Sequence, residues 1–119
     1  MKTACATAAL LLAFAFIQPA MAQKQYGPGV TDTEIKLGQT MPYSGPASSY
    51  STIGKVEAAY FRMINEHGGI NGRKIDLISL DDGYSPPKTV EQVRRLVEED
   101  HVLGTFQTLG TPTNTAIVN

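Results

Sequence analysis

The chain has 119 residues, of which 42% are apolar and 18% charged, a composition typical of one small folded domain and not of a disordered protein. Ten basic and eleven acidic residues leave a formal charge of −1, which gives no electrostatic reason to expect nucleic acid or an anionic membrane surface as a partner. A single cysteine excludes an internal disulfide, and no His/Cys cluster has the spacing of a zinc site. We therefore expect neither a metal nor another cofactor.

Residues 1–22 have the layout of a secretory signal peptide. Lys2 and the amino terminus supply positive charge, residues 8–17 form an uncharged apolar run, and Ala20-Met21-Ala22 is a small-x-small cleavage signal. The apolar run is too short to remain as a membrane-spanning helix. We therefore expect an exported chain that begins at Gln23 after cleavage and does not span the membrane; a buried N-terminal helix is the alternative.

Strand and helix patterns alternate after residues 23–33, a polar, glycine-containing segment that we expect to be a flexible leader. Apolar patterning between turn residues predicts three strands, at 34–40, 74–81 and 102–107. Helical periodicity with start signals predicts three helices, which begin near Thr52, Pro86 and Thr113. Ser51 or Thr52, Ser85 and Thr111 are the predicted caps of these helices.

Each of the first two predicted helices has a stripe of apolar residues that we expect to face the core. In the first helix the stripe is Ile53, Val56, Ala59, Tyr60, Met63 and Ile64, and in the second it is Val90, Val93, Leu96 and Val97.

The order β-α-β-α-β-α predicts an α/β fold in three layers, with a parallel sheet and right-handed crossovers. The third helix has no stop signal, and a three-stranded parallel sheet leaves its edges open. We therefore expect residues 34–119 to form part of a lobe that belongs to a longer protein.

Open parallel sheets bind ligands beyond the carboxyl ends of their strands, where neighbouring strands send their helices to opposite faces. The loops at that edge are 41–51, 81–86 and 108–112, which are rich in hydroxyls, glycine and proline and contain no Lys or Arg. In the last loop, threonine hydroxyls and the free N–H groups of a helix start suit a carboxylate. A plain helix cap explains the same residues.

Three tyrosines, Tyr43, Tyr50 and Tyr84, fall in these loops. A tyrosine in a cleft offers a flat apolar wall and a hydroxyl, although ordinary packing accounts for any one of them alone. We select Tyr43 and Tyr50 as candidate ligand-binding residues.

The pair Asp81-Asp82 resembles a catalytic or metal-binding pair of acids. Adjacent residues at a strand end point to opposite sides, and the sequence places no third acid, histidine or basic partner beside them. Capping of the following turn is therefore the favoured interpretation. No motif for a nucleophile or a phosphate loop occurs, and we expect no enzymatic activity.

Several segments together resemble periplasmic solute-binding proteins of the branched-chain amino acid (Leu/Ile/Val) type, which have the class I fold and serve ABC importers. These segments are Ile35-Lys36-Leu37-Gly38, Ser44-Gly45-Pro46, the turn Gly68-Gly69-Ile70-Asn71-Gly72, Asp81-Asp82 and Gly110-Thr111-Pro112-Thr113. The resemblance covers nearly all of residues 23–119. It implies most of the first three βα units of the first, N-terminal lobe in a two-lobed protein that closes on its ligand.

The resemblance also implies a ligand site and a function. Gly110, Thr111 and Thr113 would hold the carboxylate and ammonium of the ligand through backbone groups and hydroxyls, and Tyr50 would form an aromatic wall. Pro112 removes one N–H donor from this set. The implied function is capture of a small amino acid or related carboxylate in the periplasm and its delivery to ABC-transporter permease subunits. A sensory-receptor ectodomain, an exported metal-dependent hydrolase using Asp81 or Asp82, and a remnant without function are the alternatives.

Overall fold

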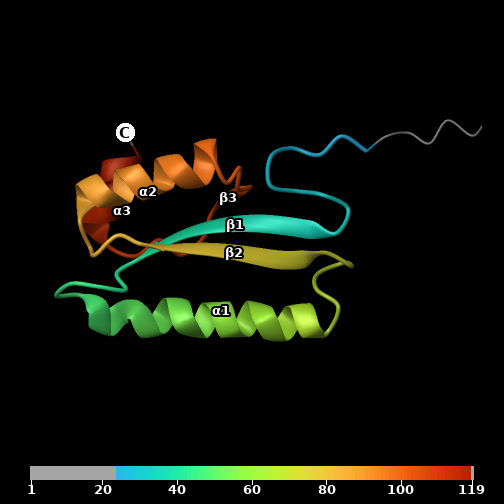
Figure 1. The fold of residues 1–119 in the computed structure, drawn as a ribbon, viewed down its shortest axis with the longest axis horizontal. Helices are drawn as coiled ribbons and strands as arrows, with labels where there is room; N and C mark the ends of the chain where they lie inside the picture. The colour runs from blue at the N-terminus through green and yellow to red at the C-terminus, as the bar shows by residue number, and fades with distance from the viewer. Residues whose placement is uncertain (1–23, 119) are drawn as a thin grey trace, which may run out of the picture.

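The computed structural model describes residues 24–118, in which strands and helices alternate along the chain. The elements are β1 (Glu34–Met41), the 3₁₀ helix η1 (Ser48–Tyr50), α1 (Ser51–Glu66), β2 (Lys74–Asp81), α2 (Pro86–Glu98), β3 (Gly104–Thr105) and α3 (Thr111–Ile117). Helix α1 lies on one face of the sheet, and α2 and α3 lie on the other (Figure 1). The predicted α/β class with a parallel sheet is confirmed. The predicted signal peptide lies outside the described residues.

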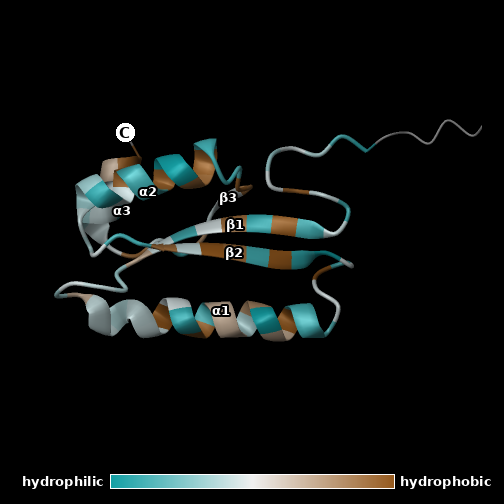
Figure 2. Cartoon of the chain, viewed as in Figure 1, coloured by the Kyte–Doolittle hydropathy of each residue, from teal (hydrophilic) through white to brown (hydrophobic). Residues whose placement is uncertain are grey.

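The sheet has the strand order β2-β1-β3, and both strand pairs are parallel. Strands β1 and β2 pair along their whole length, from Glu34 opposite Lys74 to Met41 opposite Asp81. Polar and apolar positions alternate in the amino-terminal half of each of these strands (Figure 2). The carboxyl half of β1 is buried, because β2 lies on one side of it, β3 and the segment up to Leu109 follow it on the other, and a helical layer covers each face.

The third strand is shorter than predicted, with two residues in place of the expected segment 102–107. The segment nevertheless follows β1, because Leu103 N donates to Lys36 O (2.9 Å) and Phe106 N donates to Gly38 O (2.7 Å). Gln107 then takes a positive φ of 49°, which ends the extended backbone.

The predicted core face of α1 is wrong. Tyr60 and Val56 are 55% and 61% exposed, while Ser51 and Gly54 are buried against the sheet. Two contacts set this rotation of the helix. Gly54 has no side chain to hold α1 away from β1, and three turns later the Asn65 amide both donates to and accepts from the backbone of Ile75, each at 2.8 Å.

Helix α1 also lacks the predicted side-chain cap, because η1 leads directly into it and places Tyr50 at the cap position. Helix α3 begins at Thr111, with Gly110 as its cap residue at a φ of 110° in place of the predicted Thr111.

Helix α2 begins at Pro86, as predicted, and Ser85 occupies the cap position. The Ser85 side chain makes no capping hydrogen bond. The backbone carbonyl of Ser85 accepts from Thr89 N (2.8 Å), as the carbonyl of a cap residue ordinarily does. Leu96 is fully buried under the sheet, whereas Val97, which we expected in the core, is 55% exposed.

The segment before β1 contacts the sheet from Gly29 onwards. Lys36 N donates to Gly29 O (2.7 Å), Lys74 N donates to Thr33 O (2.8 Å), and Val30 forms a bridge with Ile35. Among the helices of residues 24–118, none has the length and apolar character needed to cross a membrane.

Candidate functional site

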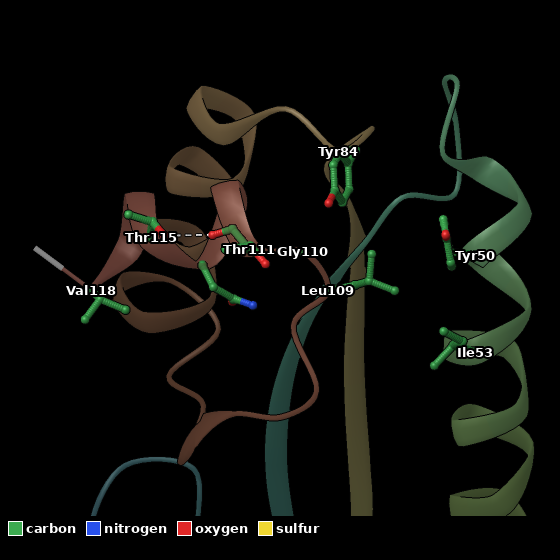
Figure 3. A pocket seen from close by; sticks show the side chains of 9 residues that line it. Tyr50, Ile53, Tyr84, Leu109, Gly110, Thr111, Thr115 and Val118 are labelled. Carbon is green, nitrogen blue, oxygen red and sulfur yellow. Dashed lines mark hydrogen bonds between the residues drawn. The ribbon is translucent and has the colours of Figure 1, made fainter.

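A hollow of about 800 Å³ lies at the carboxyl edge of the sheet (Figure 3). Strand β1 sends its helix to one face and β3 sends its helix to the other, so the loops after these strands diverge and leave a space between them. The start of α1 forms one wall, the loop into α3 forms the opposite wall, and Tyr84 from the loop after β2 lies between them. The volume is in the range of small-molecule sites.

The apolar surface of the hollow comes from both walls. Tyr50, the last residue of η1, and Ile53 of α1 point into it from one wall. Leu109 and Val118 line it from the α3 side. Tyr50 is 55% exposed and Ile53 is 42% exposed, so both side chains have surface left to contact a solute.

The polar surface lies on the α3 side, where Gly110, Thr111 and Asn114 line the hollow. Asn114 holds the loop that precedes it: its amide nitrogen donates to Thr108 O (2.9 Å), and its amide oxygen accepts from the Thr108 hydroxyl. These two hydrogen bonds fix the loop from Thr108 to Asn114, which contains Thr111. No Asp, Glu, Lys or Arg of the described chain lines this hollow.

Tyr84 owes its place to the turn after β2. Its backbone lies in the left-handed region, with a φ of 64°, and its N–H donates to the buried carboxylate of Asp82 (2.9 Å). The Tyr84 ring lies against Gly110, which belongs to the loop between β3 and α3.

The structure brings three of the predicted ligand-binding residues, Tyr50, Gly110 and Thr111, into this one hollow. Thr113 does not line it: the residue is fully buried, and its hydroxyl lies 2.6 Å from Leu109 O and 2.8 Å from Gly110 O. The Thr113 hydroxyl thus stabilises the turn that leads into α3.

Tyr43 also lies outside the hollow. Its hydroxyl shares a hydrogen bond of 2.6 Å with Ser79 Oγ, which in turn donates to Gln39 Oε1 (2.7 Å). The Gln39 amide donates onwards to Glu57 of α1. Tyr43 thus belongs to a polar chain between the sheet and α1.

Among the residues that line the hollow, Tyr84 was a candidate that we did not select, and Ile53, Leu109 and Asn114 are not predicted from the sequence. The available signal for Tyr84 was the same as for Tyr50, since both follow a strand at the carboxyl edge of the sheet.

Asp81 joins two loops. Its Oδ1 accepts from the backbone N–H groups of Tyr43 (2.9 Å), Ser44 (3.1 Å) and Gly83 (3.0 Å). Its Oδ2 accepts from Ser44 Oγ (2.5 Å) and pairs with Lys88 Nζ (3.2 Å), a basic partner that the sequence analysis did not find. Burial raises the pKa of this carboxyl, but the hydrogen bonds from Ser44, Gly83 and Lys88 outweigh it and hold the pKa well below its ordinary value.

Asp82 points to other partners. It is fully buried, its Oδ1 accepts from Tyr84 N, and its Oδ2 accepts from the Thr89 hydroxyl (2.8 Å). Both acids therefore hold turns in place. Within residues 24–118 no group of three or more His, Cys, Asp or Glu side chains could hold a metal ion.

Comparison with known proteins gives a consistent result. The family model described as periplasmic binding protein matches residues 34–119. An amino acid binding protein from Pseudomonas aeruginosa is 34% identical over 73 residues, which are 59% of this chain and 19% of that protein. Leu/Ile/Val-binding protein homolog 7 from Brucella abortus is 30% identical over 90 residues, 72% of this chain and 22% of its own.

Among solved structures, the fatty acid ABC transporter substrate-binding protein from Thermomonospora curvata superposes with a TM-score of 0.69 at 34% identity. The match covers 78% of this chain and 24% of that protein. These relatives are named as binding proteins and not as enzymes. The chain spans about a fifth of the length of the curated relatives that it matches.

Proposed function

The chain belongs to the periplasmic binding protein family, and from that premise we propose that it is the exported solute-binding component of an ABC importer. In this proposal it works in the periplasm, after removal of the signal peptide at residues 1–22, and delivers its ligand to permease subunits. The relatives named for amino acids and for fatty acids support a ligand that carries a carboxylate. We propose a small amino acid or related carboxylate.

The observation that carries the proposal is the hollow shared by Tyr50, Gly110 and Thr111. A ligand with an apolar body and a polar end matches its two surfaces, because the body would cover Tyr50 and Ile53 while the polar end meets neutral donors near Thr111. Hydrogen bonds to a charged ligand group are stronger than neutral ones, so neutral donors suffice to bind a carboxylate.

We propose that the hollow is one half of a clamp. Tyr50 and Tyr84, which line it, remain exposed to solvent. In a two-lobed family member the second lobe would cover these exposed rings, and the reaction would be reversible binding with closure, in which no covalent bond breaks.

The test uses the complete gene product that carries this chain. A thermal-shift screen of amino acids, fatty acids and aromatic acids should find a compound that raises the melting temperature, because a ligand that binds only the folded state stabilises it. Titration calorimetry on that compound should then show affinity at least about tenfold weaker in Tyr50→Ala and in Thr111→Ala.

Tyr60→Ala is the matched control, since Tyr60 is also 55% exposed on α1 but lies outside the hollow. It should leave affinity unchanged. A screen without a stabilising compound would count against the function, and unaltered binding in both site variants would remove the site assignment.

A further inference from the structure

The two loops that lead to Tyr50 and Tyr84 meet at one carboxylate. Asp81 accepts hydrogen bonds from Tyr43 and Ser44, in the loop after β1, and from Gly83, in the loop after β2. Lys88 of α2 completes the set. The carboxylate therefore links the two loops and α2.

The two loops also approach each other backbone to backbone. A Cβ placed at Gly45 would lie 3.2 Å from Gly83 O, and Gly45 has a φ of 79° while Gly83 has one of 58°. Both positions have a positive φ, which favours glycine, and a side chain at Gly45 would also crowd the Gly83 carbonyl. The contact is thus made by main chain, with the carboxylate beside it, and the loops cannot move independently without breaking these bonds.

Short hydrogen-bonded paths lead from this contact to both tyrosines of the hollow. On one side, Ser48 N donates to Gly45 O (3.1 Å) and Tyr50 N donates to Ala47 O (3.0 Å), so the chain from Gly45 to Tyr50 is a fixed turn. On the other side, Tyr84 directly follows Gly83. A shift of either loop at the carboxylate would therefore move the ring that it carries.

We propose that Asp81 is a positioning residue for ligand binding, which sets the separation of Tyr50 and Tyr84 by tying their loops together. The carboxylate does not line the hollow, so it acts through the two rings and makes no contact with the ligand. This inference rests on the proposed function for its effect on affinity, but the coupling of the loops is a property of the ligand-free protein.

Hydrogen exchange of the ligand-free complete gene product tests the coupling directly, because amides that lose a partner exchange faster. Asp81→Ala should accelerate exchange in segments 42–50 and 82–85 together, while exchange in β1 and β2 stays slow and shows that the fold is kept. Ser44→Ala, which removes one hydroxyl donor, should produce the same pattern to a smaller extent. Asp76→Asn, at an exposed acid on the same strand, should change neither loop.

Titration with L-leucine, or with the compound selected by the screen, measures the consequence for binding. Asp81→Asn should weaken affinity about tenfold in the wild-type background and markedly less in a Tyr84→Ala background, because a residue that acts through Tyr84 loses its effect when the ring is gone. A purely structural role would give the same loss in both backgrounds.

The outcomes separate the two proposals. Faster exchange in both loops with no binding of any screened compound would refute the proposed function and leave the loop coupling in place. Unchanged exchange in Asp81→Ala and Ser44→Ala, or acceleration in one loop only, would overturn the positioning role, whatever the affinity does.

Discussion

The ring of Tyr84 lies directly on the backbone of Gly110. A Cβ placed at Gly110 would be 2.5 Å from Tyr84 Cε2 and 2.6 Å from the Thr113 hydroxyl. Gly110 also has a φ of 110°, a conformation that glycine adopts readily and other residues rarely do. The contact between the loop after β2 and the loop after β3 therefore depends on the absence of a side chain at position 110.

Gly110→Ala should destabilise the protein by more than about 2 kcal/mol, because backbone strain and crowding against Tyr84 add together. It should also weaken ligand binding, since the ring must move to admit the methyl group. Urea denaturation and calorimetry measure the two effects.

Gly68→Ala is the matched control for this prediction. Gly68 has a φ of 100° and no atom within 4 Å of a Cβ placed there, so the substitution imposes similar backbone strain without crowding. It should destabilise less than Gly110→Ala and leave binding unchanged. Equal losses at both positions would contradict the importance of the Tyr84 contact.

Gly54→Ala should destabilise the protein, although alanine is the better helix former by about 1 kcal/mol. The Cβ would lie 2.5 Å from the Tyr43 hydroxyl and 3.1 Å from Met41 Cγ, between α1 and the sheet. Urea denaturation measures the loss.

Tyr43→Phe provides the control, because it removes the oxygen that the new methyl group would meet. The double variant Gly54→Ala, Tyr43→Phe should lose less stability than the sum of the two single variants. Strict additivity would show that the crowding lies elsewhere.

The strands could be predicted from sequence because their pattern is local. Alternation between turn residues placed β2 at its observed bounds and β1 within one residue of them. The rotation of α1 could not be predicted in the same way. Hydrophobic periodicity predicts that Val56 and Tyr60 face the core. The observed orientation of the helix is instead set by the close approach of Gly54 to the sheet and by the hydrogen bonds of Asn65, neither of which depends on hydrophobicity.

The site could be predicted in part, for a related reason. Tyr50 and Thr111 follow adjacent parallel strands, so topology alone brings their loops together. The choice between Tyr43 and Tyr84 needed information that no short segment contains. The Tyr43 hydroxyl bonds to Ser79, 36 residues away, and Tyr84 reaches the hollow through a positive φ.

Thr89→Val should destabilise the protein by about 1–3 kcal/mol, because it replaces a hydroxyl that bonds to a buried carboxylate with a methyl group of the same size. Thr89 and Asp82 are both fully buried, and their hydrogen bond is 2.8 Å long. Urea denaturation at neutral pH measures the change. Thr89→Ser keeps the hydroxyl and should retain more stability than Thr89→Val; a larger loss in the serine variant would refute this role of the bond.

The stability contributed by Asp81 should decline in acid. Its pKa in the folded protein lies below the ordinary value of 3.8, so the unfolded chain takes up the proton first as the pH falls. The contribution is therefore complete well above pH 3.8 and shrinks below that value, until the pH passes the folded pKa. Urea midpoints of wild type and Asp81→Asn should differ most near neutral pH and draw closer as the pH falls below 3.8. Asp76→Asn, measured alongside, corrects for the general loss of one negative charge. If the difference in urea midpoint between wild type and Asp81→Asn grew in acid, hydrogen bonds to the ionised carboxylate would not be what stabilises these loops.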